Sequence, residues 1–112
     1  MTTLHIGIAG AGLAGRTLAQ NDDCPGALVV INGANGPYSN VGATTSVPAW
    51  PCGAGVADIW FRYTPSGSGV LTADTCGAGF DTTMEIFDGT AGCGALVSLG
   101  CNDDFCGLQS SV

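Results

Sequence analysis

Five oxygen-bearing side chains in the C-terminal third of the chain have the chemistry of calcium ligands. They stand near the ends of apolar runs, in segments rich in glycine: Asp81, Asp88, Asn102, Asp103 and Asp104. Calcium takes carboxylate and carbonyl oxygens from loops. The spacing matches no known calcium loop, and Asp and Asn also stabilise turns by bonding to their own backbone. The pattern therefore has two interpretations, a calcium site and a set of acidic turns.

The two tryptophans, Trp50 and Trp60, raise a second kind of site, an aromatic platform for a sugar. Trp60 lies in a run of aromatic and β-branched residues, which predicts packing in a strand. Trp50 stands between Ala49 and Pro51 in a predicted loop, where binding residues are more frequent. Trp50 is therefore the candidate ligand-binding residue.

Catalytic constellations are weakly represented. The single histidine, His5, lies in an N-terminal apolar segment, and no serine stands in a nucleophile-elbow pattern. Glycoside cleavage needs two carboxyl groups that face one cleft. The sequence contains two pairs of acids, Asp81 with Asp88 and Asp103 with Asp104, but nothing in it places either pair across one cleft. We predict that the chain has no catalytic residues and is not an enzyme.

The stretch "IAGAGLAG" at residues 8–15 has the glycine spacing of a dinucleotide-binding turn. Such a turn must leave a strand and enter a helix, but the polar run "NDDCPG" at 21–26 leaves room for only about one or two helical turns. Residues 4–14 also have the length of a signal-peptide apolar core, with cleavage predicted before Gln20. A third interpretation is an ordered N-terminal strand. The segment is too short to span a membrane.

Six cysteines, an even number, are spread over residues 24–106: Cys24, Cys52, Cys76, Cys93, Cys101 and Cys106. No Cys-x-x-Cys pair is present, and one histidine does not complete a usual zinc set. The cysteines therefore predict disulfides and export to an extracellular or cell-surface location.

The charge pattern excludes two classes of protein. With two Lys and Arg residues and a net charge of -7, the chain has no basic groove for nucleic acid. A hydrophobic content of 46% argues against disorder. We therefore expect a folded domain with no nucleic-acid partner.

Short apolar runs between Gly, Pro, Asn and Asp clusters predict an all-β fold, an antiparallel β-sandwich with disulfide bonds. Two domain segments are expected, an apolar segment at 1–20 and the sandwich module at 21–112. The strongest strand is 58–64, with Ile59, Phe61 and Tyr63 facing inward. Further strands are expected at residues 27–31, 38–46, 70–74, 83–88, 95–99 and 108–112. The run at 70–74 is expected to form a hairpin with 58–64.

Four segments together resemble a family of bacterial secreted modules related to the bacterial pre-peptidase C-terminal domain. They are "NDDC" at 21–24, "ADIWFRYTP" at 57–65, "DTCGAGFDTTMEIFDG" at 74–89 and "CNDDFCGLQSSV" at 101–112. The resemblance implies a jelly-roll-like fold and a non-catalytic accessory role, such as adhesion, substrate targeting or assistance in secretion. Family members continue through further strands, so the resemblance implies that the module at 21–112 is incomplete.

Under this resemblance the cysteines pair as Cys24 with Cys52, Cys76 with Cys93 and Cys101 with Cys106, although six cysteines allow fifteen connectivities. The expected function is a binding or adhesion module of a larger exported protein. Its partners would be the rest of its own polypeptide, another copy, or an extracellular polysaccharide or protein. One alternative is an assembly subunit completed by a strand from another copy; a weaker one is a dinucleotide-binding fragment. Neither a cofactor other than calcium nor membrane insertion is expected.

Overall fold

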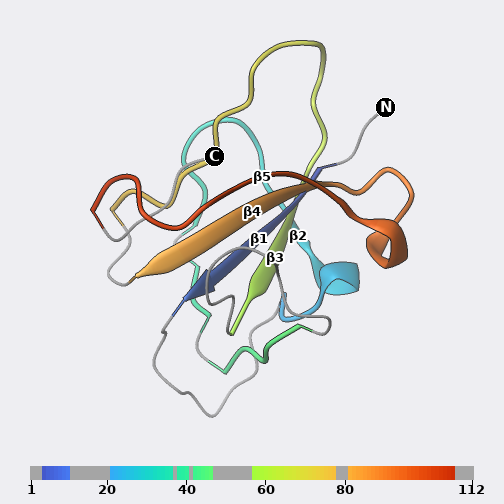
Figure 1. Ribbon diagram of the computed structural model, residues 1–112. Coiled ribbons are helices and arrows are strands. Elements are labelled where there is room, and N and C mark those ends of the chain that lie inside the picture. The colour runs from blue at the N-terminus through green and yellow to red at the C-terminus, as the bar shows by residue number, and fades with distance from the viewer. Residues whose placement is uncertain are drawn as a thin grey trace.

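The computed structural model describes residues 4–10, 21–36, 38–40, 42–46, 57–77 and 81–107. Its elements in chain order are β1 (Leu4–Gly10), η1 (Cys24–Gly26), β2 (Leu28–Val29), β3 (Ile59–Tyr63), β4 (Thr82–Asp88), η2 (Cys93–Ala95) and β5 (Val97–Asn102) (Figure 1). No helix in this part of the chain is long and apolar enough to cross a membrane. The prediction of a mostly-β, disulfide-linked chain is confirmed.

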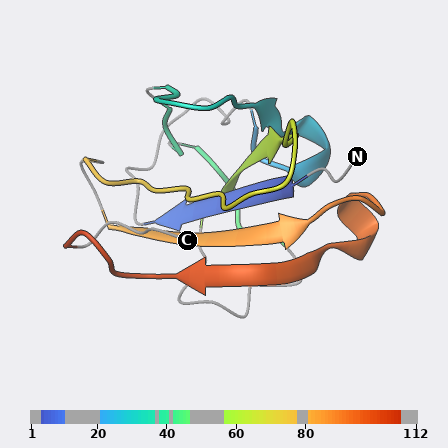
Figure 2. The same ribbon diagram turned by 90° about the horizontal axis from the view of Figure 1, so that it is seen from above.

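The strands form one five-stranded sheet in the order β2-β3-β1-β4-β5. Antiparallel pairing joins β1 to β3, β1 to β4, and β4 to β5, whereas β2 runs parallel to β3. The prediction of a purely antiparallel fold is therefore wrong at the β2–β3 pair. The described residues form this single, open sheet, with β5 at one edge (Figure 2).

The N-terminal strand β1 lies in the middle of the sheet, between β3 and β4. Ile6 stands opposite Phe61 on one side and Ile86 on the other. Apolar residues alternate with His5 and Gly7, so β1 has the period of two that a strand with one apolar face requires. Residues 4–10 thus belong to the same sheet as β2, β3, β4 and β5, and of the three interpretations of this segment the strand is the one seen here.

One side of the sheet, here called the aliphatic face, carries the main core. Six buried side chains form it: Leu4, Ile6, Ile59, Phe61, Met84 and Ile86. Partly buried residues from the connecting segments pack on them, including Val30, Ala43 and Leu71. The inward orientation predicted for Ile59 and Phe61 is confirmed, whereas Tyr63 is only half-buried.

The opposite side, here called the mixed face, combines apolar and polar residues. Trp60 and Phe87 are buried, with ring centroids 5.5 Å apart. Cys24, Ala27 and Leu96 cover them from η1, η2 and the adjacent backbone. The same face also holds the buried polar side chains of His5, Thr83 and Glu85. Both faces of the sheet are thus covered, which explains why Trp60 is as buried as its neighbours.

Two predicted strands match their ranges, the run at 27–31 is reduced to β2, and the runs at 38–46 and 70–74 form no strand in the described residues. β3 and β4 lie within one residue of the runs at 58–64 and 83–88. The hairpin expected between 58–64 and 70–74 is wrong, because β3 is already paired on both edges, with β1 and β2. The described residues of 38–46 form loops, and β5 begins at Val97 because η2 takes up the start of the run at 95–99. The strand predicted at 108–112 lies outside the described residues.

The disulfides join segments that are distant in sequence. Cys24 pairs with Cys93, with 5.9 Å between their Cα atoms, and Cys76 pairs with Cys106, with 5.8 Å. All three predicted pairings are therefore wrong. Cys101 is also disulfide-bonded, and Cys52 lies outside the described residues. The physical reason is that the sheet brings η1 against η2, so the fold and not sequence proximity selects the partners.

Candidate binding groove

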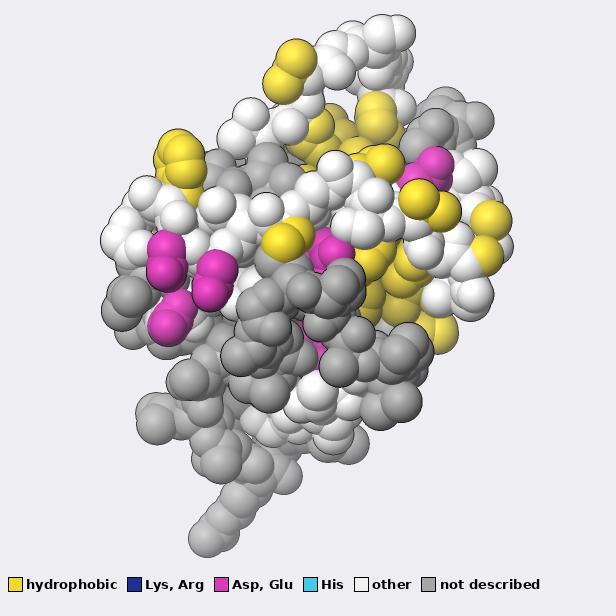
Figure 3. All heavy atoms as spheres, in the orientation of Figure 1, with side chains coloured by type: hydrophobic (Ala, Val, Ile, Leu, Met, Phe, Trp, Pro, Cys, Tyr) yellow, Lys and Arg dark blue, Asp and Glu magenta, His cyan; other side chains and the backbone are white. Residues whose placement is uncertain are grey.

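A groove of about 1020 Å³ opens on the aliphatic face beside β1 and β3. Leu4, Ile6 and Tyr63 contribute to its lining from the sheet, and the segments 30–35 and 65–72 supply the rest. Figure 3 shows apolar side chains gathered in the hollow beside the loop that projects at the top of the molecule. A cavity of this size lies at the upper end of the range typical of small-molecule sites.

The first wall of the groove is shaped by hydrogen bonds. Asn35 donates from Nδ2 to the carbonyl oxygens of Ile31 (2.7 Å) and Gly33 (2.9 Å), and its Oδ1 accepts from the Ile31 backbone nitrogen at 3.1 Å. Gly33 has a φ of +96°, a conformation that side chains rarely adopt. The Tyr63 hydroxyl donates to Asn32 Oδ1 at 2.5 Å, so the wall is also tied to β3.

The second wall, residues 65–72, is a Ser- and Gly-rich segment that carries an exposed valine. Val70 is 97% exposed, and Ile31 on the opposite wall is 70% exposed. None of the described lining residues carries a charge, although the whole chain has a net charge of -7. The groove therefore offers apolar contacts, hydroxyls and backbone groups to an uncharged ligand.

Three of the five predicted calcium ligands come together. The carboxylates of Asp81, Asp103 and Asp104 lie within 4.8 Å of one another and are exposed. They stand where β4 begins and β5 ends, and Figure 3 shows acidic side chains grouped at one edge of the molecule. Thr83 Oγ1 donates to Asp103 Oδ1 at 2.8 Å, which ties the acidic group to the sheet.

Of the other two predicted ligands, Asp88 lies outside this acidic group. Asp88 is at the far end of β4 and accepts hydrogen bonds from Thr90 Oγ1 (2.6 Å) and the Thr90 backbone nitrogen (2.9 Å). These bonds, the side-chain one first, hold the pKa of the Asp88 carboxyl below its usual value. Asp88 is thus an acid that stabilises a turn, as in the second interpretation. Asn102 ends β5 opposite Met84 and directly precedes Asp103 in the chain.

Trp50, the predicted sugar-binding residue, lies outside the described residues. Trp60 is buried as expected and is held by a polar contact that its strand pattern did not indicate. Its Nε1 donates to Asp58 Oδ2 at 2.7 Å, and Asp58 also accepts from the backbone nitrogen and Oγ of Ser46. Asp58 is fully buried, so this acid has a structural role.

The dinucleotide interpretation receives no structural support from the described residues. Gly10 ends β1, and residues 11–20 lie outside the description. β1 is antiparallel to both of its neighbours, whereas a dinucleotide fingerprint begins a strand that has a parallel partner in a βαβ unit. The groove of the aliphatic face is therefore the better candidate site.

Comparison of the chain with protein-family models, curated proteins and solved structures finds no match. The resemblance to modules related to the pre-peptidase C-terminal domain therefore stays a hypothesis. The groove itself was missed at the sequence level. Its only signal was the run "PSGSGV" at 65–70 in the second wall, which predicted a tight turn. The first wall and the floor come from segments far away in sequence.

Proposed function

We propose that the chain is a non-catalytic binding module of an exported protein and that it holds an uncharged extracellular polymer in the groove of the aliphatic face. The observation that supports this proposal is the composition of the groove. Its described lining combines apolar residues with Ser, Thr and Asn and contains no acid, histidine or base. Such a surface can bind a polymer, and it offers no carboxylate, imidazole or amine for general acid–base chemistry.

The disulfides support the exported part of the proposal. Cys24–Cys93 and Cys76–Cys106 link segments that are 69 and 30 residues apart, which is typical of small domains in oxidising compartments. The relationship to secreted modules, the jelly-roll-like sandwich that it implies, and the role in adhesion or substrate targeting all belong to this proposal. A net charge of -7 favours a neutral polymer over an acidic one.

Binding can be tested with neutral and acidic polysaccharides immobilised side by side. We expect the neutral ones to retain the protein. Val70→Asp places a charge on one wall of the groove and should weaken binding about tenfold or more, or about 1.4 kcal/mol. Val97→Asp is the matched control, because Val97 is exposed on β5 and does not line the groove. Equal binding by both variants, or turnover of an ester, peptide or glycoside, would contradict the proposal.

The alternative of an assembly completed by strand exchange has one observation in its favour. β5 is an edge strand, and its side chains Val97 and Leu99 are 61% and 59% exposed. An exposed edge strand is a template for another chain. Residues 4–10 already lie in the middle of their own sheet, so another segment would have to be the donor. A monomer by light scattering at high concentration would exclude this alternative.

A further inference from the structure

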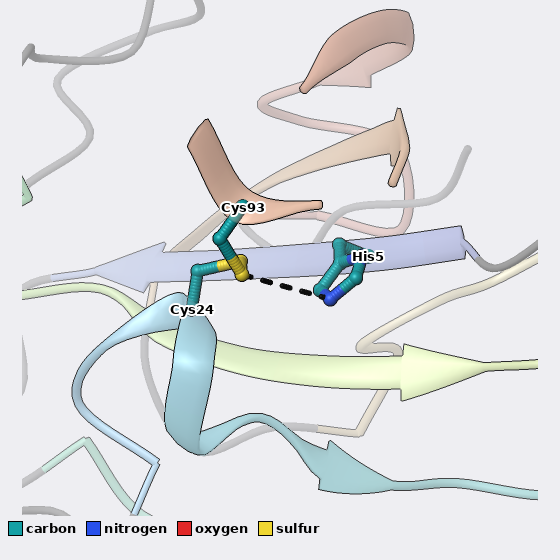
Figure 4. Close-up of side chains that lie close together, drawn as sticks. All are labelled: His5, Cys24 and Cys93. Atoms are coloured by element: carbon teal, nitrogen blue, oxygen red, sulfur yellow. Dashed lines mark hydrogen bonds between the residues drawn. A yellow bond between two sulfur atoms is a disulfide. The ribbon is translucent and has the colours of Figure 1, made fainter. Parts of the chain in front are cut away.

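A histidine and a disulfide meet on the mixed face. His5 comes from β1, Cys24 from η1 and Cys93 from η2, and Figure 4 shows the imidazole directed at the bridge. His5 Nε2 lies 3.8 Å from Cys93 Sγ. A ring nitrogen of His5 and the two sulfurs all lie within 4.8 Å of one another. Three elements that are far apart in sequence thus bring one nitrogen and two sulfurs together.

The imidazole lacks the partners that a buried polar ring normally has. His5 is only 6% exposed, and its Nδ1 is buried without a hydrogen-bond partner. Its Nε2 contacts the bridged Cys93 sulfur, which is a weak acceptor. An unsatisfied buried polar group costs about 1–3 kcal/mol. A leucine at position 5 would avoid this cost. The presence of the imidazole therefore indicates a function in another state of the site.

The ring is also fixed in position. A Cβ placed on Gly89 would lie 1.8 Å from His5 Nδ1, so the imidazole rests directly against the Gly89 backbone. The ring is therefore held in one position, beside the Cys24–Cys93 bridge. Burial first, and then the positive charge of Arg62, hold the pKa of His5 below its usual value.

We propose that, once a dithiol has reduced the Cys24–Cys93 bridge, His5, Cys24 and Cys93 bind a thiophilic divalent ion of the zinc class. Zinc binds to cysteine sulfur at about 2.3 Å and to histidine nitrogen at about 2.0–2.1 Å. In a tetrahedron with these bond lengths, a nitrogen and a sulfur ligand are about 3.5 Å apart. The observed 3.8 Å between His5 Nε2 and Cys93 Sγ is close to this value.

The backbone positions suit both states of the site. The Cα atoms of Cys24 and Cys93 are 5.9 Å apart, so rotation about the Cα–Cβ bonds can bring both sulfurs onto one ion without moving η1 or η2. Two thiolates and one imidazole make three protein ligands, and water takes the fourth position, as in open zinc sites. Cys24 and Cys93 are half-buried, which leaves a path for the reductant and the ion.

The chemistry balances in two steps. The dithiol gives two electrons and two protons to the bridge; it becomes a disulfide, and Cys24 and Cys93 become thiols. The divalent ion then displaces one proton from each thiol and takes the lone pair of His5 Nε2, so two protons are released for each ion bound. Under oxidising conditions, Cys24 and Cys93 therefore join η1 and η2 by a covalent bond. Under reducing conditions, the same two cysteines and His5 join them through a metal ion.

Cobalt provides the test, because Co²⁺ in a tetrahedral thiolate site gives strong visible and near-ultraviolet absorption. The full chain is reduced anaerobically with a phosphine, which takes an oxygen atom from water and leaves the same thiols, and is titrated with Co²⁺. We expect a tetrahedral spectrum with one ion per chain. His5→Gln should weaken binding more than about tenfold, since loss of even an outer-shell partner costs 10- to 100-fold.

The cysteines provide the matched controls. Cys76→Ser/Cys106→Ser should keep the spectrum, and Cys24→Ser/Cys93→Ser should lose it. A second readout does not need the spectrum: Zn²⁺ should protect Cys24 and Cys93 from alkylation, as mapped by mass spectrometry, and His5→Gln should abolish the protection. The proposal is overturned by absence of binding, by protection of all cysteines alike, or by affinity that does not depend on His5. Failure of the reduced chain to bind because it unfolds counts as absence of binding.

Discussion

The two faces of the sheet are buried by different means. The aliphatic face buries interchangeable apolar side chains such as Ile6, Ile86 and Met84 under loops. The mixed face buries Trp60 and Phe87 together with polar groups, and a disulfide crosses it. One face is therefore stabilised mainly by burial of apolar area, which tolerates change if volume is kept. The mixed face depends on specific polar contacts and on one disulfide, so we expect it to tolerate substitution less well.

The two faces also differ in the groups that they offer for binding or reaction. The aliphatic face leaves part of its apolar surface open as the groove, where Leu4 and Ile6 contribute to the lining. The mixed face has its chemically reactive groups, His5 and the Cys24–Cys93 bridge, brought together by η1 and η2. A single sheet thus separates the groove from the reactive groups by placing them on opposite faces.

The largest expected effect comes from the bridge on the mixed face. The chain-entropy model gives about 4.4 kcal/mol for the Cys24–Cys93 loop and about 3.6 kcal/mol for the Cys76–Cys106 loop, from separations of 69 and 30 residues. Cys24→Ser/Cys93→Ser should therefore destabilise the fold more than Cys76→Ser/Cys106→Ser. Denaturant unfolding of both variants measures the difference, and the reverse order would contradict it.

A matched pair of substitutions tests the contrast between the faces directly. Trp60→Phe removes the donor to the buried Asp58 carboxylate and should cost about 2–4 kcal/mol. Ile6→Val on the aliphatic face removes one methylene and should cost about 0.5–1.5 kcal/mol. Urea unfolding of the two variants under identical conditions compares them. Similar costs would mean that the polar contacts of the mixed face add nothing to the free energy of unfolding beyond what apolar packing supplies.

The contact between Gly89 and His5 allows a double-mutant cycle. Gly89→Ala should cost about 1–3 kcal/mol, because its Cβ would lie 1.8 Å from His5 Nδ1. Adding His5→Ala should recover most of this cost, so the two changes should not be additive. Gly94→Ala is the control, since a Cβ there meets nothing within 4 Å and should change stability little. Additive effects of Gly89→Ala and His5→Ala would show that the ring is not fixed as described.

Calcium should have a smaller effect, at the end of the sheet where Thr83 holds Asp103. Extracellular calcium sites have dissociation constants of about 0.1–1 mM. With a dissociation constant of about 1 mM, 10 mM calcium would stabilise the fold by about 1.4 kcal/mol. We expect the thermal midpoint to rise with calcium, and Asp81→Asn/Asp104→Asn to lose this rise. If magnesium raises the midpoint as much as calcium does, the acidic group only screens charge.

The smallest effect concerns pH and the neutral ring of His5. The pKa of His5 is lowered from its ordinary 6.5, so below that pH the unfolded chain binds more protons than the folded one. This contribution to stability is present above about pH 6.5 and is lost as the pH falls further. Denaturation of the disulfide-bonded protein at pH 7.5 and pH 5 should show the loss, and His5→Leu should reduce it. An unchanged pH dependence in His5→Leu would contradict the assignment.

Several features followed from the sequence for local physical reasons. β3 and β4 were predicted within one residue, because aromatic and β-branched residues in alternation favour a pleated strand. The clustering of Asp81 with Asp103 and Asp104 was anticipated in part, since these residues flank the two antiparallel strands β4 and β5. The hairpin from β3 to 70–74 failed, because adjacency in sequence does not reveal which edges are already paired.

The sequence by itself determined that the chain is acidic, rich in strands and linked by disulfides, because composition and a period of two are local properties. Only the tertiary structure decided that β1 lies between β3 and β4, that Cys24 meets Cys93, and that loops cover both faces. Alternation shows which residues share a face, but what covers that face depends on contacts between distant segments. The groove and the meeting of His5 with the bridge depend on such contacts, so they could be found only in the folded chain.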